Sequence, residues 1–469
     1  MSEVGSTTRS ADPDSAARGG ARRALLLGSL GMFVVALDTT IVNIAFTTIA
    51  GSLHASTGRL AWVLNAYSLV FAALLIPAGW VADRYGRKRV FLVGLVGFAA
   101  MSALCAAAPD VGVLIAGRGL QAVFAALVVP SSLALILQEF PPAQRPMAVG
   151  TWGSMGAVAA ALAPTAGALL TEYASWRWIF LINVPIAAGM AVFGSRVLRE
   201  TRAPATSRFP DPVGAVLVAA IPALLSLSLL QGPYWGWSDP RVIGGFVLGF
   251  ALLPVFLWRC WTAANPVMDL ALFKERQFLL VNAGTLLFAT AFFGLLLSGV
   301  VFLQTDWHYS ALRSALATVP GPLVVILLAR PAGRLATRLG HRRVLLAGAA
   351  AWFVGSGLLA VQAGDSAHWA ADWLPGTVFI GIGAALTLPI QPGAAAKSLP
   401  PRQFAVGSAI NASFRQLGAV LGVSIFVAVQ NSAGPAAYVD AFHHAWWAFA
   451  ALGLAAGLAV CLPTRRKGA

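Results

Sequence analysis

Charged residues are scarce in this chain. Asp, Glu, Lys and Arg together make up 10% of its 469 residues, whereas a soluble domain carries about 25%. Hydrophobic residues make up 58%, and the mean hydropathy is +0.77. A water-exposed surface cannot be built from so few charges. The composition therefore excludes a cytosolic or secreted enzyme and predicts an all-α protein with many membrane spans.

Cysteines and catalytic signatures are equally sparse. The three cysteines, Cys105, Cys260 and Cys461, are far apart and form no CxxC pair. This spacing argues against a disulfide framework and against a zinc site. The sequence contains no GxxxxGK[ST], HExxH or GxSxG string, so enzymatic chemistry and ATP binding have no visible location. We expect no bound cofactor or metal, and the proton gradient remains as the energy source.

Negative charge is scarcer than positive charge, with 17 acidic against 32 basic residues. In a membrane protein Lys and Arg collect in cytoplasmic loops because positively charged segments resist translocation. With the N-terminus in the cytoplasm, 26 basic residues fall inside and four outside, and Arg118 and Arg415 fall within helices. We therefore expect a multi-pass protein of the bacterial cytoplasmic membrane, with both termini in the cytoplasm and no nucleic-acid partner.

The apolar stretches are long enough to cross a bilayer as helices, since a span of about 30 Å takes roughly 20 residues. Every backbone N–H and C=O must be satisfied inside such a segment, so only helices fit. Fourteen stretches are predicted to span, at 24–50, 60–82, 89–108, 111–138, 145–171, 177–197, 212–231, 241–261, 277–305, 311–336, 343–362, 373–396, 403–431 and 440–462.

One internal repeat divides the chain. The segment from Gly79 to Val90 (GWVADRYGRKRV) returns 254 residues later from Gly333 to Val344 (GRLATRLGHRRV). Each copy follows the second helix of a six-helix block, an arrangement typical of transporters that bind substrate between two halves. We expect a disordered cytoplasmic tail over 1–21, a six-helix bundle over 22–200, a linker with two extra spans over 201–276, a second six-helix bundle over 277–462 and a basic cytoplasmic tail over 463–469.

Four strings resemble motifs of one transporter family. Gly79 to Val90 resembles the GxLaDrxGrkrxl loop of the major facilitator superfamily. Leu37 to Ala45 (LDTTIVNIA), Trp176 to Pro185 (WRWIFLINVP) and Arg415 to Gly418 (RQLG) are similar to strings of its fourteen-helix drug:proton antiporter branch. The resemblance covers about 22–462. It implies two six-helix bundles plus two extra central helices, and proton-coupled export of drugs or antibiotics.

The first loop motif predicts a cytoplasmic latch. Gly86 suits a tight turn, and Asp83 at a helix end can pair with the basic residues beside it. In the resembling family this latch locks the cytoplasmic side of the outward-facing state, and Glu139 is placed to accept Arg84 or Arg87. A loop that is merely positive inside is the alternative. The predicted latch residues are Gly79, Asp83, Arg84, Gly86, Arg87, Lys88, Arg89 and Glu139.

Asp38 is the one residue among 17 acidic residues that falls in the middle of a predicted span. A carboxylate there is costly and usually faces a cavity, a cation or a proton path. Arg118 lies in the fourth span, and its expected role is to tune an acidic partner, because Arg keeps its own proton. We expect Asp38 and Arg118 to couple protons to transport. The alternative is a structural ion pair.

The fifth span carries the string APTAGA from Ala163 to Ala168, where the resembling family has a GPxxGG-type antiporter motif. Pro164 and Gly167 match that motif, but alanine replaces two of the glycines. Small residues let helix backbones approach closely, which alanine satisfies in part. The departure weakens the case for strict antiport more than the case for a transporter.

Polar and aromatic residues inside the spans predict a cavity for an amphiphilic small molecule. For any one of them, a hydrogen bond between helices is the alternative. Arg415, central in its span, is expected to bind an anionic substrate group or a lipid headgroup. The candidates are Thr39, Asn43, Asn65, Tyr67, Gln121, Trp152, Asn282, Gln391, Asn411, Arg415 and Gln416.

Two other functions fit the same sequence. An importer or facilitator with this fold would share the loop motifs, whereas a non-transporting sensor or scaffold would use Asp38 and Arg118 only for structure. The intact first loop and the position of Asp38 argue against the sensor or scaffold.

Overall fold

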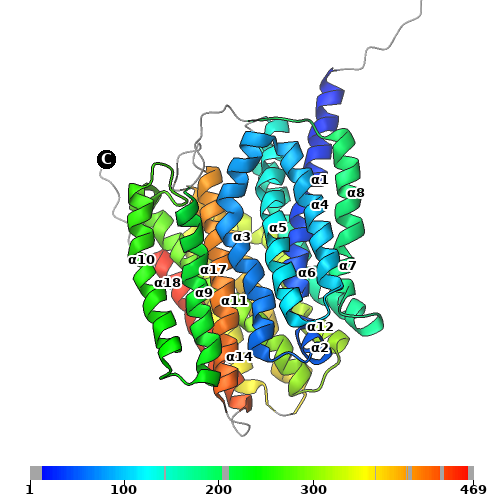
Figure 1. Ribbon diagram of the computed structural model, residues 1–469. Coiled ribbons are helices and arrows are strands. Elements are labelled where there is room, and N and C mark those ends of the chain that lie inside the picture. The colour runs from blue at the N-terminus through cyan, green and yellow to red at the C-terminus, as the bar shows by residue number, and fades with distance from the viewer. Residues whose placement is uncertain are drawn as a thin grey trace, which may run out of the picture.

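The computed structural model describes residues 13–141, 144–202, 211–364, 366–397, 399, 404–433 and 438–462. Throughout these residues the regular structure is helical (Figure 1). Thirteen of the helical segments are long and apolar enough to cross a membrane. The expectation of an all-α membrane protein is thus confirmed. The predicted span 145–171 coincides with helix α6, which is not among the thirteen and in which several side chains lie outside the described residues.

The helices follow the chain in three groups. The first group is α1 (Pro13–Ile41), α2 (Phe46–Ser52), α3 (Thr57–Tyr85), α4 (Arg87–Ala106), α5 (Val111–Glu139), α6 (Arg145–Tyr173), α7 (Trp178–Leu181) and α8 (Asn183–Val197). The second is the pair α9 (Pro212–Trp235) and α10 (Pro240–Thr262). The third is η2 (Leu270–Lys274), α11 (Arg276–Thr305), α12 (Ala311–Thr318), α13 (Pro320–Leu339), α14 (His341–Gln362), η3 (Trp369–Trp373), α15 (Leu374–Thr387), α16 (Gln391–Lys397), α17 (Phe404–Ser432) and α18 (Tyr438–Cys461).

The N-terminal tail was expected to be disordered through residue 21, and this is wrong for its second part. Helix α1 begins at Pro13 and runs without a break through residues 13–21. Alanine and arginine are strong helix formers, and proline is favoured in the first turn of a helix, which explains the early start. Residues 1–12, like the predicted basic tail at 463–469, lie outside the described residues.

Four predicted spans are interrupted, and one of them, 177–197, is broken only at Ile182 between α7 and α8. The first breaks between Ile41 and Phe46, where the amides of Asn43 and Ile44 bond to carbonyls three residues back. The Asn43 side chain also donates to the Thr40 carbonyl at 3.1 Å, and such local bonds compete with the helix ladder. The other two breaks lie next to Pro320, between α12 and α13, and around Pro389, between α15 and α16. Proline lacks an amide donor and disfavours helix in the residue before it.

Two helical halves meet along α3 and α17. In the first half α5 packs against α3 and α4, and α1 packs against α6; in the second half α11 packs against α17 and α18, and α14 against α15 and α18. Helix α17 also packs against α3 of the first half. The seam between the halves therefore runs through the centre of the molecule.

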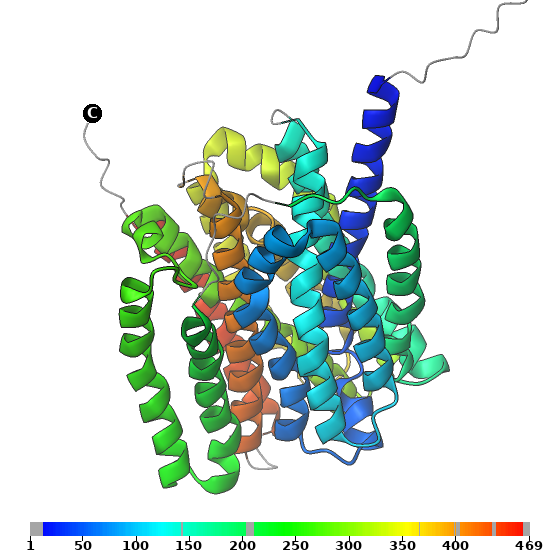
Figure 2. The ribbon, with the colours of Figure 1, turned by 45° about the horizontal axis from the view of Figure 1, so that its top comes forward.

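The extra helix pair lies at the edge of this seam. Helix α9 contacts both α3 and α17, and α10 packs mainly against α9. Figures 1 and 2 show the pair beside α17 at one side of the bundle. The sequence alone does not place this pair in the bundle. In the structure α9 bridges the two halves, and α10 has little of its apolar surface buried.

Bonds between the halves are found at the end opposite to the Gly79 to Val90 loop. There Gln304 of α11 donates to the Ile44 carbonyl at 3.3 Å and hydrogen-bonds to the Thr47 hydroxyl. The Glu172 carboxylate of α6 accepts the backbone amide of Leu312, in α12, at 2.7 Å. Helices α2 and α12 lie at the bottom of Figure 1, far from the α3–α4 turn. The bundle is therefore closed at this end.

An ion pair fixes α9 to α10. The buried Asp211 carboxylate caps α9 by accepting the amide of Gly214 at 3.0 Å, and it accepts Arg259 at 2.8 and 2.9 Å. The hydrogen bonds from Arg259 hold the pKa of Asp211 below its usual value of 3.8. One carboxylate thus both caps a helix and joins two helices.

We predict that Asp211→Ala lowers the free energy of unfolding by about 1–2 kcal/mol, because both the cap and the ion pair are lost. Asp211→Asn keeps a capping side chain and should cost less. Since the folded-state pKa is lowered, the carboxylate contributes stability above pH 3.8 and loses it as the pH falls through the folded-state value. The measurement is thermal unfolding of the purified protein between pH 7 and pH 3.

The control for this prediction is Asp269→Asn, since Asp269 caps η2 through the Ala271 amide at 2.9 Å. A difference between wild type and Asp211→Asn that persists unchanged at low pH would contradict the role given to the ion pair.

Candidate transport site

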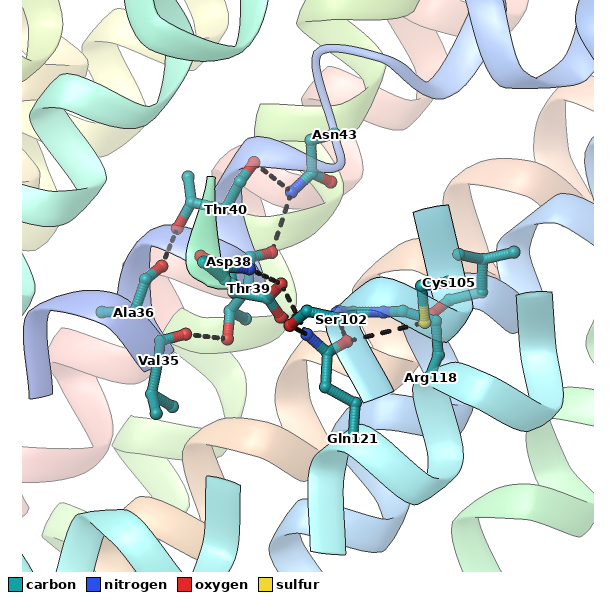
Figure 3. A network of polar contacts seen from close by, with 12 residues as sticks. Val35, Ala36, Asp38, Thr39, Thr40, Asn43, Ser102, Cys105, Arg118 and Gln121 are labelled. Atoms are coloured by element: carbon teal, nitrogen blue, oxygen red, sulfur yellow. Dashed lines mark hydrogen bonds and ion pairs between the residues drawn. The ribbon is translucent and has the colours of Figure 1, made fainter. Parts of the chain in front are cut away.

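A buried carboxylate stands at the centre of the first half. Asp38 of α1 is 0% exposed. Its Oδ2 accepts Arg118 Nη1 of α5 at 2.5 Å, and its Oδ1 accepts Gln121 Nε2 at 3.0 Å (Figure 3). Asn183 Nδ2 of α8 donates to the same Oδ1 at 2.8 Å. Three helices thus converge on one acid, and the predicted pairing of Asp38 with Arg118 is present.

The Arg118 guanidinium makes several further contacts in this network. Besides Asp38, its Nη1 donates to Gln121 Oε1 at 2.7 Å, and its Nε donates to the Val63 carbonyl at 3.4 Å. The guanidinium carbon lies 4.1 Å from the centre of the Tyr67 ring, within the range of a cation–π contact. Removing two charges from water is costly, and a buried pair persists only where further hydrogen bonds satisfy both partners. The surroundings of Arg118 meet that condition.

Gln121 has a different role from the one predicted. It was expected to line the substrate cavity, but both ends of its amide are used inside the first half. Its Nε2 donates to the Ser102 hydroxyl at 2.7 Å as well as to Asp38. Its Oε1 accepts Arg118 and lies 3.9 Å from the Cys105 thiol. Gln121 therefore orients the ion pair and ties it to α4.

Sequence reasoning missed two members of this network, Asn183 and Ser102. Both are fully buried. Asn183 belongs to the WRWIFLINVP string, where it is the one polar side chain between Trp178 and Pro185, and this was the available signal. Its Oδ1 has no hydrogen-bond partner among the described residues. Ser102 carried no signal, because serine is common in membrane helices.

A small cavity adjoins the ion pair on the side of the second half. Four predicted residues line it, namely Thr39, Asn43, Asn65 and Tyr67, together with Arg118. The second half contributes Phe293, Ala419 and Val423. The free volume is about 10 Å³, which holds about one water molecule. In this conformation the two halves close on each other beside Asp38, and a larger ligand requires them to separate.

The remaining cavity candidates lie elsewhere. Trp152 donates to the Ser132 hydroxyl at 3.0 Å and packs in a cluster with Ala21 and Leu25, and it does not line the cavity beside Arg118. Asn411 donates to Asn282 at 3.1 Å, which joins α17 to α11. Helix-to-helix bonding, the alternative given for each candidate, holds for these residues.

Three candidates from the second half complete the set. Gln391 is buried at the start of α16. Gln416 is buried, and its Oε1 accepts no hydrogen bond from the described residues. Arg415 is partly exposed and has no ion pair within the described part of the chain.

A larger cavity of about 480 Å³ lies outside the central site. It is bordered by α9, α17 and α18, with Trp237, Asp440 and His444 among its lining residues. Its walls are mainly apolar and it opens widely to the surroundings. None of the residues of the Asp38 network lines it, so it is separate from the ion pair.

The predicted latch has a different acceptor from the one expected. Arg87, the first residue of α4, pairs with Asp83 of α3 across the turn at 2.9 Å, and its Nη1 lies 3.5 Å from Gln138 Oε1. Glu139 was expected to accept Arg84 or Arg87, but its carboxylate lies beside Gly20 of α1. Glu139 is one residue further along α5 than Gln138. Its side chain is therefore rotated by about 100° around the helix axis, towards α1.

The segment after α8 clamps the latch loop. The Glu200 carboxylate accepts the backbone amides of Lys88 and Arg89, each at 3.0 Å, at the N-terminus of α4. Lys88 Nζ donates to the Ser195 carbonyl at 2.7 Å. Gly86 has a φ of +116°, which only glycine adopts readily. A side chain at Gly86 would also collide with Glu200, because a Cβ would stand 2.7 Å from its carboxylate.

The second copy of the loop repeats the turn but lacks the negative charge of Asp83. Gly340 has a φ of +87°, similar to Gly86. Thr337 stands where the first copy has Asp83, and its hydroxyl donates to the Arg334 carbonyl of its own helix at 2.7 Å. The second turn therefore has the geometry of the first without its Asp–Arg pair.

The predicted antiporter string lies against the first helix just after Asp38. Gly167 of α6 faces Ile41, and a Cβ on Gly167 would stand 3.3 Å from the Ile41 carbonyl oxygen. Pro164 lies inside α6, one turn earlier. Of the APTAGA string, Gly167 is thus the residue that allows α1 and α6 to approach closely at the point where α1 breaks.

Comparison with known proteins identifies the family. The family model for the Major Facilitator Superfamily matches residues 28–301 and 281–469. The tetracenomycin C resistance and export protein of Streptomyces glaucescens is 32% identical over 421 residues, covering 88% of this chain and 76% of that protein. The methylenomycin A resistance protein of Bacillus subtilis (strain 168) is 32% identical over 404 residues, covering 86% of each chain.

A solved structure shares the fold. The crystal structure of an auto-inhibited POT family peptide transporter has a TM-score of 0.69 and 19% sequence identity, covering 94% of this chain and 96% of that one. The family consists of membrane transporters and not of enzymes, in agreement with the sequence. This chain belongs to the major facilitator superfamily, and its curated relatives are antibiotic resistance and export proteins.

Proposed function

We propose that this protein exports drugs or antibiotics across the bacterial cytoplasmic membrane in exchange for protons. The bundles at 22–200 and 277–462 would alternate between two openings, with both termini in the cytoplasm. No cofactor is needed, and the partners are membrane lipid, protons and an amphiphilic small molecule. The printed functions of the relatives support export. The observation that supports proton coupling is the buried Asp38–Arg118 pair beside the cavity.

Protonation of Asp38 would change the network in a defined way. As a carboxylate it accepts three donors, from Arg118, Gln121 and Asn183. A proton on Oδ2 removes the charge that attracts Arg118 and occupies the oxygen that accepts it. Arg118 also lines the cavity. Proton binding therefore leaves a positive charge without its partner at the cavity wall, and this links the proton to the substrate space.

The break in α1 provides a mechanical connection. Asp38 is followed by Thr39, which lines the cavity, and then by the break between Ile41 and Phe46, in which Asn43 also lines the cavity. Ile44, inside the break, and Thr47, just after it, hydrogen-bond to Gln304 of the second half. A shift of Asp38 relative to Arg118 is thereby transmitted to the bonds that close the end opposite the latch. Such a two-state element is what alternating access requires.

The latch and its clamp would act at the other end. Asp83, Arg87 and Glu200 belong to one half, so the clamp stiffens the α3–α4 turn. We propose that Gly79, Asp83, Arg84, Gly86, Arg87, Lys88 and Arg89 form the surface that meets the second half when the cytoplasmic side closes. Glu200 joins this set in place of Glu139.

We predict that Asp38→Asn lowers the rate of proton-linked export on the order of 100-fold, because asparagine keeps the shape of the side chain but binds no proton in this pH range. The measurement is substrate-dependent dissipation of the pH gradient in energised everted vesicles, with a panel of dyes and antibiotics. Exchange of labelled substrate at equal pH should survive. Asp110→Asn is the matched control, because Asp110 caps α5 from the surface and asparagine also caps well.

Equal gradient-driven transport by Asp38→Asn and wild type would refute proton coupling through Asp38. Accumulation in right-side-out vesicles, with none in everted vesicles, would favour an importer on the same fold. Wild-type protein that moves no substrate in either orientation would favour the sensor or scaffold.

We predict that Glu200→Ala destabilises the latch loop by about 1 kcal/mol, because the first amides of α4 lose their acceptor. Glu200→Gln retains an acceptor, so the stability of its latch loop should lie between those of Glu200→Ala and wild type. The measurement is the rate of hydrogen exchange at the amides of Lys88 and Arg89, followed together with transport. Glu172→Ala, at the opposite end, should leave these amides unchanged. Identical exchange rates in wild type and Glu200→Ala would show that the clamp is not needed.

A further inference from the structure

Within the membrane helices, one positive charge at the seam between the halves has no negative partner among the described residues. Among the described side chains, Asp38 and Arg118 neutralise each other at 2.5 Å inside the first half. Arg415 lies in the central part of α17 and has no ion pair among those residues. A lone cation at this depth is costly, and intramembrane charges usually mark a substrate or ion pathway.

The position of Arg415 on its helix directs it towards the seam. Ala412, three residues earlier, packs against the core of the first half. Ala419, four residues later, lines the cavity beside Arg118. Residues three and four apart lie on the same side of a helix. The Arg415 side chain therefore emerges between two positions that both face the first half, and it remains partly exposed there.

Two buried amide oxygens along the seam also lack partners. Gln416 Oε1, next in sequence to Arg415, and Asn65 Oδ1, in the cavity wall, accept no hydrogen bond from the described residues. Both side chains are at least nine-tenths buried. A buried acceptor left without a donor costs about 1–3 kcal/mol. A ligand that supplies hydroxyl or amide hydrogens would satisfy these oxygens.

We propose that the seam selects amphiphiles carrying an anionic oxygen, such as a carboxylate or phenolate, and that Arg415 binds that group. This inference rests on the proposed export function and specifies its substrate class. Arginine presents a planar set of donors that matches a carboxylate in two hydrogen bonds. The apolar walls formed by Phe293 and Val423 would contact the rest of the molecule. A cationic amphiphile would meet two guanidinium groups at this seam, and only Arg118 has an acidic partner.

A lipid headgroup has the same anionic chemistry, but the position of Arg415 favours a solute. Helix α17 has 29 residues and is about 43 Å long, so it extends beyond a hydrocarbon core about 30 Å thick. Arg415 lies near the middle of this helix, inside the core, whereas headgroups lie outside it. The side chain also faces the other half of the protein and not the surrounding bilayer. The ligand must therefore enter between the halves.

The charge of the substrate has a consequence for energy coupling. Exchange of one exported anion for one entering proton moves two positive charge equivalents inward, whereas exchange of a cation for a proton moves none. The membrane potential, negative inside, then drives the anion exchange directly. Anion export should slow when valinomycin and potassium collapse the potential at constant pH gradient.

The test compares two xanthene dyes of opposite charge, fluorescein and rhodamine 6G. Binding to the purified full-length protein is measured by fluorescence anisotropy, and transport is measured in everted vesicles. We expect wild type to prefer fluorescein. Arg415→Gln should weaken fluorescein binding at least about 10-fold, the effect of losing a charge-assisted hydrogen bond. Arg415→Lys keeps the charge and should retain most of the preference. Arg313→Gln, a surface substitution, is the control, and gel filtration verifies folding.

The outcomes separate this inference from the export function. Fluorescein binding that depends on Arg415, without proton-driven uptake, would keep the anion site and overturn the export function. Export of rhodamine 6G at equal rates by wild type and Arg415→Gln, with unchanged fluorescein binding, would overturn the anion site alone. Displacement of fluorescein by phosphatidylglycerol, and not by free benzoate, would assign Arg415 to a lipid and also overturn the inference.

Discussion

The buried ion pair between Asp38 and Arg118 is the constraint around which the first half is arranged. Neither charge can stay in a membrane interior alone, so each needs hydrogen bonds from neighbouring helices. Those bonds bring α1, α5 and α8 together, and Gln121 extends them to α4 through Ser102. The same pair borders the cavity between the halves. Packing of the half and the proposed response to a proton therefore depend on the same atoms.

Sequence predicted the spans and the ion pair because both leave local signals. A run of about 20 apolar residues defines a membrane helix, and a single acid in such a run is conspicuous. The repeat of the Gly79 loop at Gly333 also predicted two similar turns, and both glycines have positive φ. For the spans and the turns the physical cause lies within a few neighbouring residues, whereas the two members of the ion pair are 80 residues apart and were each conspicuous as a charge inside a span. These parts of the fold could be read without knowing how the helices pack.

The parts that sequence did not predict depend on the rotation of one helix against another. Gln121 and Trp152 were both assigned to the cavity because they are polar within spans, yet one orients the ion pair and the other packs near the start of α1. Glu139 was chosen as the partner of the latch, whereas its neighbour Gln138 faces Arg87. Glu200 lies 112 residues from its partner Lys88 and in no predicted helix. Such contacts follow from tertiary packing alone.

The extra pair of helices has a consequence for the movement of the halves. Helix α9 contacts α3 of one half and α17 of the other, and the Asp211–Arg259 pair fastens α10 to it. In the proposed rocking of the halves, α9 would have to slide along at least one of its neighbours, while α10 would move through the surrounding lipid. The viscosity and thickness of the bilayer would then resist the motion directly. Through this pair of helices, the membrane itself would set part of the resistance to the proposed transport cycle.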